Sequence, residues 1–328
     1  MPKVSIVLPN YNYEKYLDER IQSLLNQTYK DFELIILDDC STDNSIAVIQ
    51  KYLTDPRVKT CFFEKNSGSP YKRWNDGADL AHGEYLLFAG ADDSCEPTLI
   101  EKLVEKLDRH SSVGLALSQS WETDSNGNIT RSLKERTDDL FGGKERWNSD
   151  YVDRGQGELG FMLFKNTVPN ASCVLMRREL FIKAGKFDTK LIINADWMLW
   201  SKMLMISDIA YVSEHLNYFR THPRNVRNQS SQSCLDIEED CLVRKFILDN
   251  SGLSFAPETV RQAFENKLWY WFIAAGNPRN IKNWKRNLRI FGLYFSVDRK
   301  FHWQLTRHLS SKLMEEFRSK AGALRSGK

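Results

Sequence analysis

Five short apolar segments rich in β-branched residues begin at positions 4, 32, 58, 85 and 113, so their starts lie 26 to 28 residues apart. Helical patterns fill the intervals; for example, Leu17, Ile21 and Leu24 share one helix face. Strands and helices that alternate at this spacing predict βα units, which pack as an open, mostly parallel sheet with helices on both faces. No residue self-similarity accompanies the period, so we exclude a repeat array.

The pattern is less regular after this region. Residues 122–160 are polar and rich in Gly, Asn and Asp, which predicts a long loop. This stretch contains a GxGxxG match over 155–160, but no apolar strand precedes it, so we exclude a dinucleotide site. Further elements are expected as a strand over 172–176, helices over 178–184 and 197–205, a short edge strand over 209–212 and helices after about residue 230. We divide the chain into residues 1–110, 111–228 and 229–328.

Charge is distributed unevenly along the chain. The 46 basic and 43 acidic residues leave a net charge of +3, and no recognition motif accompanies it, so no nucleic-acid partner is expected. Residues 261–328 nevertheless carry 15 Lys and Arg against 4 Asp and Glu. Aromatic residues are interleaved with these charges: Trp269, Tyr270, Trp271, Phe272, Trp284, Phe291, Tyr294, Phe295, Phe301 and Trp303. Two interpretations stay open, a helical extension that packs on the rest of the protein, and a peripheral surface for an anionic membrane.

The cysteines and apolar runs bear on location. None of the six cysteines forms a CxxC pair, which favours reduced thiols in a cytosol. The first apolar run, over 4–8, is too short for a secretory signal. The run over 268–275 is far below the roughly 20 residues that span a bilayer. We expect a cytoplasmic protein, peripheral at the inner face of the membrane at most, which could form a homo-oligomer.

Paired carboxylates follow two of the predicted strands. Asp38 and Asp39 come directly after the second strand, and Asp92 and Asp93 follow the fourth. Because the carboxyl ends of parallel strands meet at one edge of the sheet, both pairs should point into the same crevice. Like charges at close range are unfavourable unless a cation or donor is bound there. A hard divalent ion, Mg²⁺ or Mn²⁺, bridging to a diphosphate suits such a site.

The alternative role for polar residues after a strand is to cap the next helix. We favour this role for three residues of the same loop: Ser41, Thr42 and Asp43.

Several motifs, in this order and spacing, resemble the family 2 glycosyltransferases of the GT-A fold. They are Val4-Ser-Ile-Val-Leu-Pro-Asn-Tyr-Asn12, Ser23-Leu-Leu-Asn-Gln-Thr28, Asp38-Asp-Cys-Ser-Thr-Asp43, Asn66-Ser-Gly68, Asn75-Asp-Gly77, Ala81-His-Gly-Glu-Tyr85 and Ala91-Asp-Asp93. The likeness resumes at Gly185-Lys-Phe-Asp188, Ala195-Asp-Trp-Met-Leu-Trp200 and Tyr218-Phe-Arg-Thr-His222. It implies an α/β fold of GT-A type: an open, mixed, mostly parallel, Rossmann-like sheet flanked by helices, followed by a C-terminal helical extension.

The resemblance also implies site residues. The donor nucleotide sugar is expected at Pro9, Tyr11, Asp38, Asp39, Asn66 and Asp92, with Asp39 receiving the base and Asp92 near the ribose or phosphate. The metal ligands are expected to be Asp93 and His222, and the general base Asp196. Trp197, beside this base, and Arg220, beside His222, are candidates for acceptor contact.

The implied activity is transfer of a sugar, with inversion, from a UDP-sugar to a saccharide or lipid-linked glycan in bacterial surface polysaccharide synthesis. Such a transfer needs the leaving-group charge neutralised by a metal and one proton removed by a carboxylate. A nucleotidyltransferase would need a Gly-rich basic loop after the first strand, where Pro9-Asn-Tyr-Asn12 stands instead. A non-catalytic glycan- or membrane-binding protein with a degenerate transferase domain is the other alternative. Gly90 favours it, because the commoner family form has an acid there.

Overall fold

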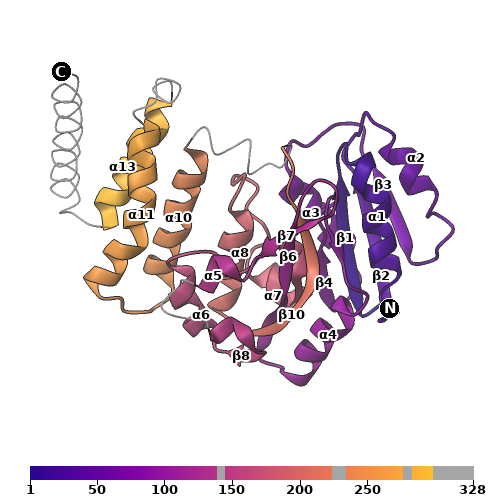
Figure 1. The fold of residues 1–328 in the computed structure, drawn as a ribbon, viewed down its shortest axis with the longest axis horizontal. Coiled ribbons are helices and arrows are strands. Elements are labelled where there is room, and N and C mark those ends of the chain that lie inside the picture. The colour runs from indigo at the N-terminus through magenta and orange to yellow at the C-terminus, as the bar shows by residue number, and fades with distance from the viewer. Residues whose placement is uncertain (139–144, 224–233, 276–282, 298–328) are drawn as a thin grey trace, which may run out of the picture.

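The computed structural model describes residues 1–138, 145–223, 234–275 and 283–297. These residues form one ten-stranded sheet flanked by helices, shown in Figure 1. The strand order is β3-β2-β1-β4-β9-β6-β10-β5, with β7 pairing with β6 and β8 pairing with β10. The predicted α/β architecture is therefore confirmed.

The first part of the chain has the predicted alternation of strands and helices. Its strands are β1 (Val4–Asn10), β2 (Phe32–Asp38), β3 (Val58–Phe62), β4 (Tyr85–Phe88) and β5 (Ser94–Cys95). Its helices are α1 (Glu14–Leu25), α2 (Ser45–Gln50), α3 (Pro70–Leu80) and α4 (Leu99–Arg109). Strand β1 pairs in parallel with β2 and β4, and β2 pairs in parallel with β3.

The second part makes the sheet mixed. Its strands are β6 (Val113–Thr123), β7 (Ile129–Ser132), β8 (Tyr151–Asp153), β9 (Val174–Arg177) and β10 (Asp208–Arg220). Its helices are α5 (Glu135–Asp138), α6 (Gly155–Met162), α7 (Arg178–Lys183) and α8 (Ala195–Leu204). Strand β9 lies between β4 and β6 and is antiparallel to both, so the fourth and fifth predicted strands are not neighbours. Strand β6 pairs in parallel with β10.

Two local predictions are wrong. Residues 122–160, expected as a loop, contain β7, α5, β8 and α6 in their described part. The GxGxxG match is helix α6, and it begins with glycine because a Cβ at Gly155 would lie 2.0 Å from the carbonyl oxygen of Ser207. The expected edge strand over 209–212 is the start of β10, which has 13 residues and lies between β6 on one side and β5 and β8 on the other. A register shift between Val212 and His215 obscures its continuation, because it interrupts the pattern of the strand.

The sheet has a core on each face. Along β1, Ile6 and Leu8 pack with the apolar sides of α1 and α4, whereas Val7 faces the opposite core, which includes α3, α7 and α8. Helix α3 lies especially close to the sheet: a Cβ at Gly77 would be 2.3 Å from Cγ1 of Val7. This alternation is what a strand covered on both faces requires.

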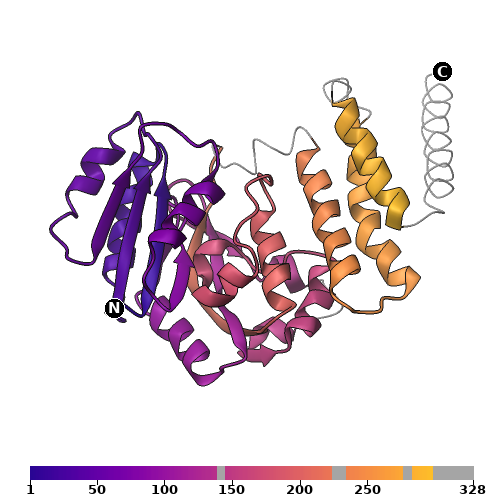
Figure 2. The same cartoon turned by 180° about the vertical axis from the view of Figure 1, so that it is seen from behind.

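The C-terminal extension contains helices α10 (Leu235–Asn250), α11 (Pro257–Ala275) and α13 (Trp284–Val297). Figures 1 and 2 show α10 beside α8, with α11 and α13 beyond it, at the opposite end of the molecule from β3. Their buried residues, such as Ile237, Phe264 and Tyr294, belong to the same core as Trp200 of α8. The described part of the extension is thus packed on the rest of the protein.

Part of the predicted basic tail, including Phe301 and Trp303, lies outside the described residues, as do the side chains of Trp269, Tyr270 and Phe272. Within the described ranges, no helix combines the length and the apolar character that a membrane crossing demands.

Candidate functional site

The expected site residues gather at one edge of the sheet. Strands β1, β2 and β4 are parallel, and β10 runs in the same direction, because β9 is antiparallel to both β4 and β6. Their carboxyl ends therefore meet at one edge, and the segments that leave them carry the candidate donor and metal residues.

Asp38 ties this edge together. Its Oδ2 accepts hydrogen bonds from Nδ2 of Asn10 at 2.7 Å and from Oγ of Ser41 at 2.7 Å, and its Oδ1 accepts from the backbone N–H of Ser41 at 2.9 Å. The side chain is 1% exposed. These contacts join the ends of β1 and β2 and leave Tyr11, 44% exposed, on the connecting segment. Asp38 thus holds the loop in place, and Tyr11 beside it is exposed to solvent.

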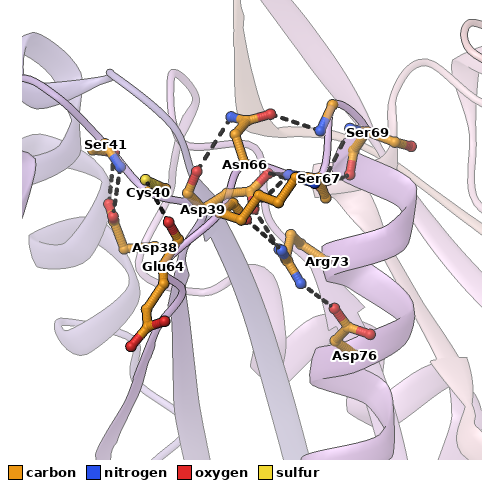
Figure 3. A network of polar contacts seen from close by, with 12 residues as sticks. Asp38, Asp39, Cys40, Ser41, Glu64, Asn66, Ser67, Ser69, Arg73 and Asp76 are labelled. Carbon is orange, nitrogen blue, oxygen red and sulfur yellow. Dashed lines mark hydrogen bonds and ion pairs between the residues drawn. The ribbon is translucent and has the colours of Figure 1, made fainter.

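Asp39 lies in a buried polar network with α3, shown in Figure 3. The Nε of Arg73 donates to Asp39 Oδ1 over 2.6 Å, and the hydroxyl of Ser67 donates to Oδ2 over 2.7 Å. The backbone N–H of Ser67 lies 3.0 Å from both oxygens. Asn66 supports the turn, since its Nδ2 donates to the backbone carbonyl of Asp39 and its Oδ1 accepts from the N–H of Gly68. The predicted base-binding carboxylate is therefore held rigidly in place.

Arg73 completes this network from α3. Its NH1 donates to Asp76 at 2.6 Å, its NH2 donates to the carbonyl of Lys65 at 3.2 Å, and its guanidinium lies 3.4 Å from the ring centroid of Phe63. With 6% of its surface exposed, the side chain is buried. The family motif often has an arginine one position later, where Trp74 stands here. The sequence assigned Arg73 no role, because it stands one position before the arginine of the motif, but the structure brings it into the candidate site through Asp39.

His222 brings the end of β10 to the acidic pair after β4. Its Nε2 lies 3.0 Å from Oδ2 of Asp92. The imidazole stacks on Tyr16, with centroids 5.3 Å apart, and meets the edge of Tyr13 at 5.8 Å. The tyrosines of the first βα segment therefore fix the ring of His222 beside Asp92.

Asp93 is buried at the centre of the site, with 3% of its surface exposed. Its Oδ2 accepts from the hydroxyl of Ser172 at 2.5 Å, and its Oδ1 accepts from the backbone N–H of Arg220 at 3.0 Å. The pKa of Asp93 is raised to about 7, first by burial and second by the negative charge of Asp92, against the opposing charge of Arg20. The ionised pair is thus poorly compensated by the protein alone.

Gly90 fits this crowded position. Its N–H donates to Oγ of Ser172 over 2.9 Å. A Cβ at Gly90 would lie 3.0 Å from Oδ2 of Asp93, 3.2 Å from Oδ1 of Asp92 and 3.3 Å from Oγ of Ser172. A larger residue would have to displace one of these polar atoms, so packing explains why position 90 is a glycine.

Two arginines lie near Asp93: Arg20, to which the sequence analysis gave no role, and Arg220, which it expected near the acceptor. Arg20 of α1 is fully buried, and among the described residues its guanidinium nitrogens have no hydrogen-bond partner. Its place on the apolar helix face, between Leu17 and Leu24, is the signal that could have revealed it. Arg220 was expected near the acceptor, but it is 3% exposed; its Nε donates to the carbonyl of Asp92 at 2.7 Å and its NH2 to Glu19 at 2.7 Å. These contacts place Arg220 in the support of the acidic pair.

The acidic pair fits a divalent metal of the predicted kind. In the part of the chain that the structure describes, no three His, Cys, Asp or Glu side chains form a metal cage. Mg²⁺ characteristically binds one or two carboxylates together with substrate phosphates, and Mn²⁺ also favours carboxylate oxygens. Asp92 and Asp93 supply adjacent carboxylates whose repulsion a cation would relieve.

Asp196 lies in the first turn of α8. It is partly exposed, and its Oδ1 accepts from the backbone N–H of Trp197 at 2.7 Å. Trp197, expected as an acceptor contact, is 3% exposed and packs in the core with the guanidinium of Arg244 5.5 Å from its ring. Burial therefore removes Trp197 from acceptor contact. Helix α3 links this region to the nucleotide loop, since the hydroxyl of Tyr71 donates to the carbonyl of Ile193 at 2.7 Å.

Sequence comparison relates the chain to known glycosyltransferases. The profile of Glycosyl transferase family 2 matches residues 5–185, more than half of the chain. The poly(ribitol-phosphate) beta-N-acetylglucosaminyltransferase TarS of Staphylococcus aureus is 36% identical over 114 residues, which are 34% of this chain and 20% of the relative. The putative teichuronic acid biosynthesis glycosyltransferase TuaG of Bacillus subtilis is 36% identical over 105 residues, 32% of this chain and 41% of the relative. The matches thus span less than half the length of these relatives.

Solved structures share the fold over nearly the whole chain. The crystal structure of S. aureus TarS residues 1–349 with UDP-GlcNAc superposes with a TM-score of 0.65 at 20% identity, covering 92% of each chain. The mannosyltransferase PcManGT from Pyrobaculum calidifontis, in complex with GDP-Man and Mn²⁺, superposes with a TM-score of 0.56 at 14% identity over 92% of this chain and 88% of that one. These likenesses confirm the expected GT-A fold. With the profile match, they lead to one conclusion: the chain belongs to glycosyl transferase family 2.

Proposed function

We propose that this protein transfers a sugar from a UDP-sugar to a saccharide or glycoconjugate acceptor, with inversion and with the help of Mg²⁺ or Mn²⁺. The observation that carries the proposal is the acidic pair of the partly buried Asp92 and the buried Asp93, held by His222 and Arg220 at the same edge as the Asp39 loop. This edge combines a carboxylate pair suited to a diphosphate-bound cation with a rigid loop suited to a base.

Donor binding is assigned to three parts of the edge. Pro9 and Tyr11 would form the wall against which the base packs, and Asp39 would accept a hydrogen bond from the base. Asn66 and Arg73 would hold that carboxylate in place through the contacts described above. Asp92 would lie near the ribose or the diphosphate.

The metal would be held by Asp93 with His222 nearby. When bound, a divalent cation neutralises the charge that develops on the departing diphosphate. The protein groups around Asp93 contribute orientation: Ser172 and the Arg220 N–H fix its two oxygens.

Asp196 would act as the general base. Its carboxylate would take the proton of the acceptor hydroxyl as the acceptor oxygen forms a bond to the anomeric carbon and the bond from that carbon to the UDP oxygen breaks. One displacement with one base inverts the anomeric configuration, and the products are the glycosylated acceptor and UDP.

The names of relatives support the substrate class. TarS is an N-acetylglucosaminyltransferase named for poly(ribitol-phosphate), its structure was solved with UDP-GlcNAc, and TuaG is named for teichuronic acid synthesis. We infer an N-acetylhexosaminyl or hexosyl donor and a bacterial surface polymer as acceptor. Location at the inner face of the membrane stays a prediction.

A panel of nucleotide sugars tests the proposal. UDP-GlcNAc, UDP-GalNAc, UDP-glucose, UDP-galactose and GDP-mannose are each incubated with the protein and MnCl₂, MgCl₂ or EDTA, and nucleotide release and binding are measured. Release that needs a divalent ion and prefers a UDP-sugar is the expected outcome. The absence of metal-dependent binding of a nucleotide sugar in every arm would overturn the proposal. Gly90 gives the non-catalytic alternative no support, because packing accounts for its missing side chain.

A further inference from the structure

The segment before α8 is held by a carboxylate from the C-terminal extension. Glu239 of α10 accepts hydrogen bonds from three consecutive backbone N–H groups, those of Ile192, Ile193 and Asn194, each over 2.8 Å. The side chain is 2% exposed. A carboxylate that takes three backbone donors in a buried place makes strong, directional contacts.

A neighbouring residue reinforces this anchor. Oδ1 of Asp240 accepts from Nδ2 of Asn194 at 2.7 Å. Asn194 is the N-cap residue of α8, and its side chain makes no capping bond to that helix. Residues of α10 therefore fix the cap residue from outside, and the negative charge of Glu239 lies where a helix N-terminus favours an anion.

The segment before α8 is also held by helix α3. The hydroxyl of Tyr71, on α3, donates to the carbonyl of Ile193. Helix α3 carries Arg73, which bonds Asp39. The residues before Asp196 are thus clamped between the nucleotide-side helix α3 and the extension helix α10.

We propose that Glu239 is a positioning residue that sets the placement of Asp196, which follows the last anchored N–H by two residues. The C-terminal extension then belongs to the catalytic architecture. This inference rests on the proposed role of Asp196 as general base. Small displacements of a reacting group cost rate steeply, about 10²-fold for about 1 Å, so loss of the three-fold anchor should reduce turnover.

The chain offers a matched control on the same helix. Glu238 is 7% exposed and accepts hydrogen bonds from Arg286 Nε at 2.9 Å and Arg289 Nε at 2.5 Å, both on α13. It therefore ties α10 to α13 and does not contact the segment before α8 in any described interaction. Glu239→Gln and Glu238→Gln make the same chemical change at adjacent, similarly buried positions.

The experiment uses the full chain with MnCl₂ and the nucleotide sugar that gives the fastest UDP release in the panel. Glu239→Gln should lower kcat about 10- to 100-fold and leave the affinity for UDP, measured by calorimetry, unchanged. Hydrogen exchange of the 188–198 segment should accelerate. Glu238→Gln should keep kcat within about twofold of the wild type even if its Tm falls.

A double variant separates positioning from general destabilisation. If Glu239 acts through Asp196, Glu239→Gln should reduce kcat little further in an Asp196→Asn background, because the two effects are not independent. Should Glu239→Gln fail to fold, Glu239→Asp, which keeps the charge, takes its place and should give an intermediate kcat with intact UDP binding.

Equal kcat losses in Glu239→Gln and Glu238→Gln, or a multiplicative loss in the double variant, would overturn the positioning role. Full turnover in Asp196→Asn would instead overturn the proposed base, and with it the premise. The two failures are therefore distinguishable.

Discussion

Arg73 and Asp39 form a buried ion pair across 2.6 Å, with the arginine side chain 7% exposed and the aspartate side chain 8% exposed. Arg73 comes from the first turn of α3 and Asp39 from the loop after β2. The pair joins the helix that contacts the segment before Asp196 to the loop that we assign to the base of the donor. It therefore connects the two halves of the proposed site.

Replacing Arg73 should cost both stability and nucleotide affinity. Arg73→Ala leaves the Asp39 charge buried without its partner, which costs about 3–5 kcal/mol of unfolding free energy for pairs of this kind. Urea denaturation and calorimetric titration with UDP measure the two effects. Lys72→Ala, an exposed neighbour on the same helix, is the control and should change neither. Equal values for the two variants would exclude the structural role of the pair.

Asp93→Ala should remove most of the Mn²⁺-dependent affinity for UDP and abolish transfer. The fold should persist, because burial and the charge of Asp92 already raise the pKa of Asp93 to about 7, so its charge does not stabilise the native state. Calorimetry with UDP in the presence and absence of MnCl₂ measures the metal-dependent part, and circular dichroism checks the fold. Near-normal turnover with Mn²⁺ would show that another group binds the metal.

Asp196→Asn keeps the shape of the side chain and removes the proton acceptor. Transfer should fall by about 10²–10⁴-fold, while UDP affinity changes little. The anomeric configuration of the wild-type product, determined by NMR, is an independent test of the same step. A product that retains the donor configuration would rule out a single displacement with one base.

The loss of stability at acid pH should depend on Glu33, which lies in β2 and is 3% exposed. Burial raises the pKa of Glu33, but hydrogen bonds from Lys59, Ser5 and the backbone N–H of His82 outweigh it, so the pKa lies below its usual value. Because the pKa of Glu33 is lower in the folded than in the unfolded chain, its ionised form stabilises the fold. This contribution is complete above the unfolded pKa of about 4.3 and is lost as the pH falls through the folded pKa.

Glu33→Gln should therefore lower stability at neutral pH by about 1–3 kcal/mol and weaken its decline toward low pH. Thermal unfolding across the acid range measures both. The control is Glu64→Gln, an exposed site that should reproduce the wild-type curve. If the stability of wild type and of Glu33→Gln declined equally steeply toward low pH, the pH dependence would belong to other carboxylates.

Membrane attachment through residues 261–328 stays a prediction, and α13 offers a way to test it. Trp284 is 57% exposed and Leu288 is 60% exposed, one helical turn apart, with the exposed Lys285 beside them. The full chain should sediment with anionic vesicles at low salt and less at high salt. Changing both Trp284 and Leu288 to Ser should reduce sedimentation several-fold.

Leu53→Ser, at a 48% exposed position after α2, is the control for a general loss of surface hydrophobicity. Substitution is preferable to truncation near Ala256, because Phe264 and Tyr294 are buried in the shared core. If the full chain does not sediment with anionic vesicles, the extension only packs on the catalytic domain.

Much of the fold could be predicted from local sequence. The apolar runs that became β1, β2 and β4 and the helical period of α1 and α4 appear within windows of a few residues, because burial of one face or both faces imposes its own spacing. The acidic pairs at the ends of β2 and β4 were found for the same reason: the end of a strand is visible locally, and parallel strands bring their ends together.

Only the tertiary structure decided which strands lie side by side and which polar residues pair with one another. Insertion of β9 between β4 and β6, the bond between Arg73 and Asp39 across 34 residues, and the bond between Glu239 and the N–H of Asn194 across 45 residues have no local signal. Which charges pair depends on which groups lose water together when distant segments pack, and that loss of solvent exists only in the folded chain. The sequence by itself determined the strands and helices of the regular first part and the chemistry at the strand ends, whereas long-range packing determined how that chemistry is held.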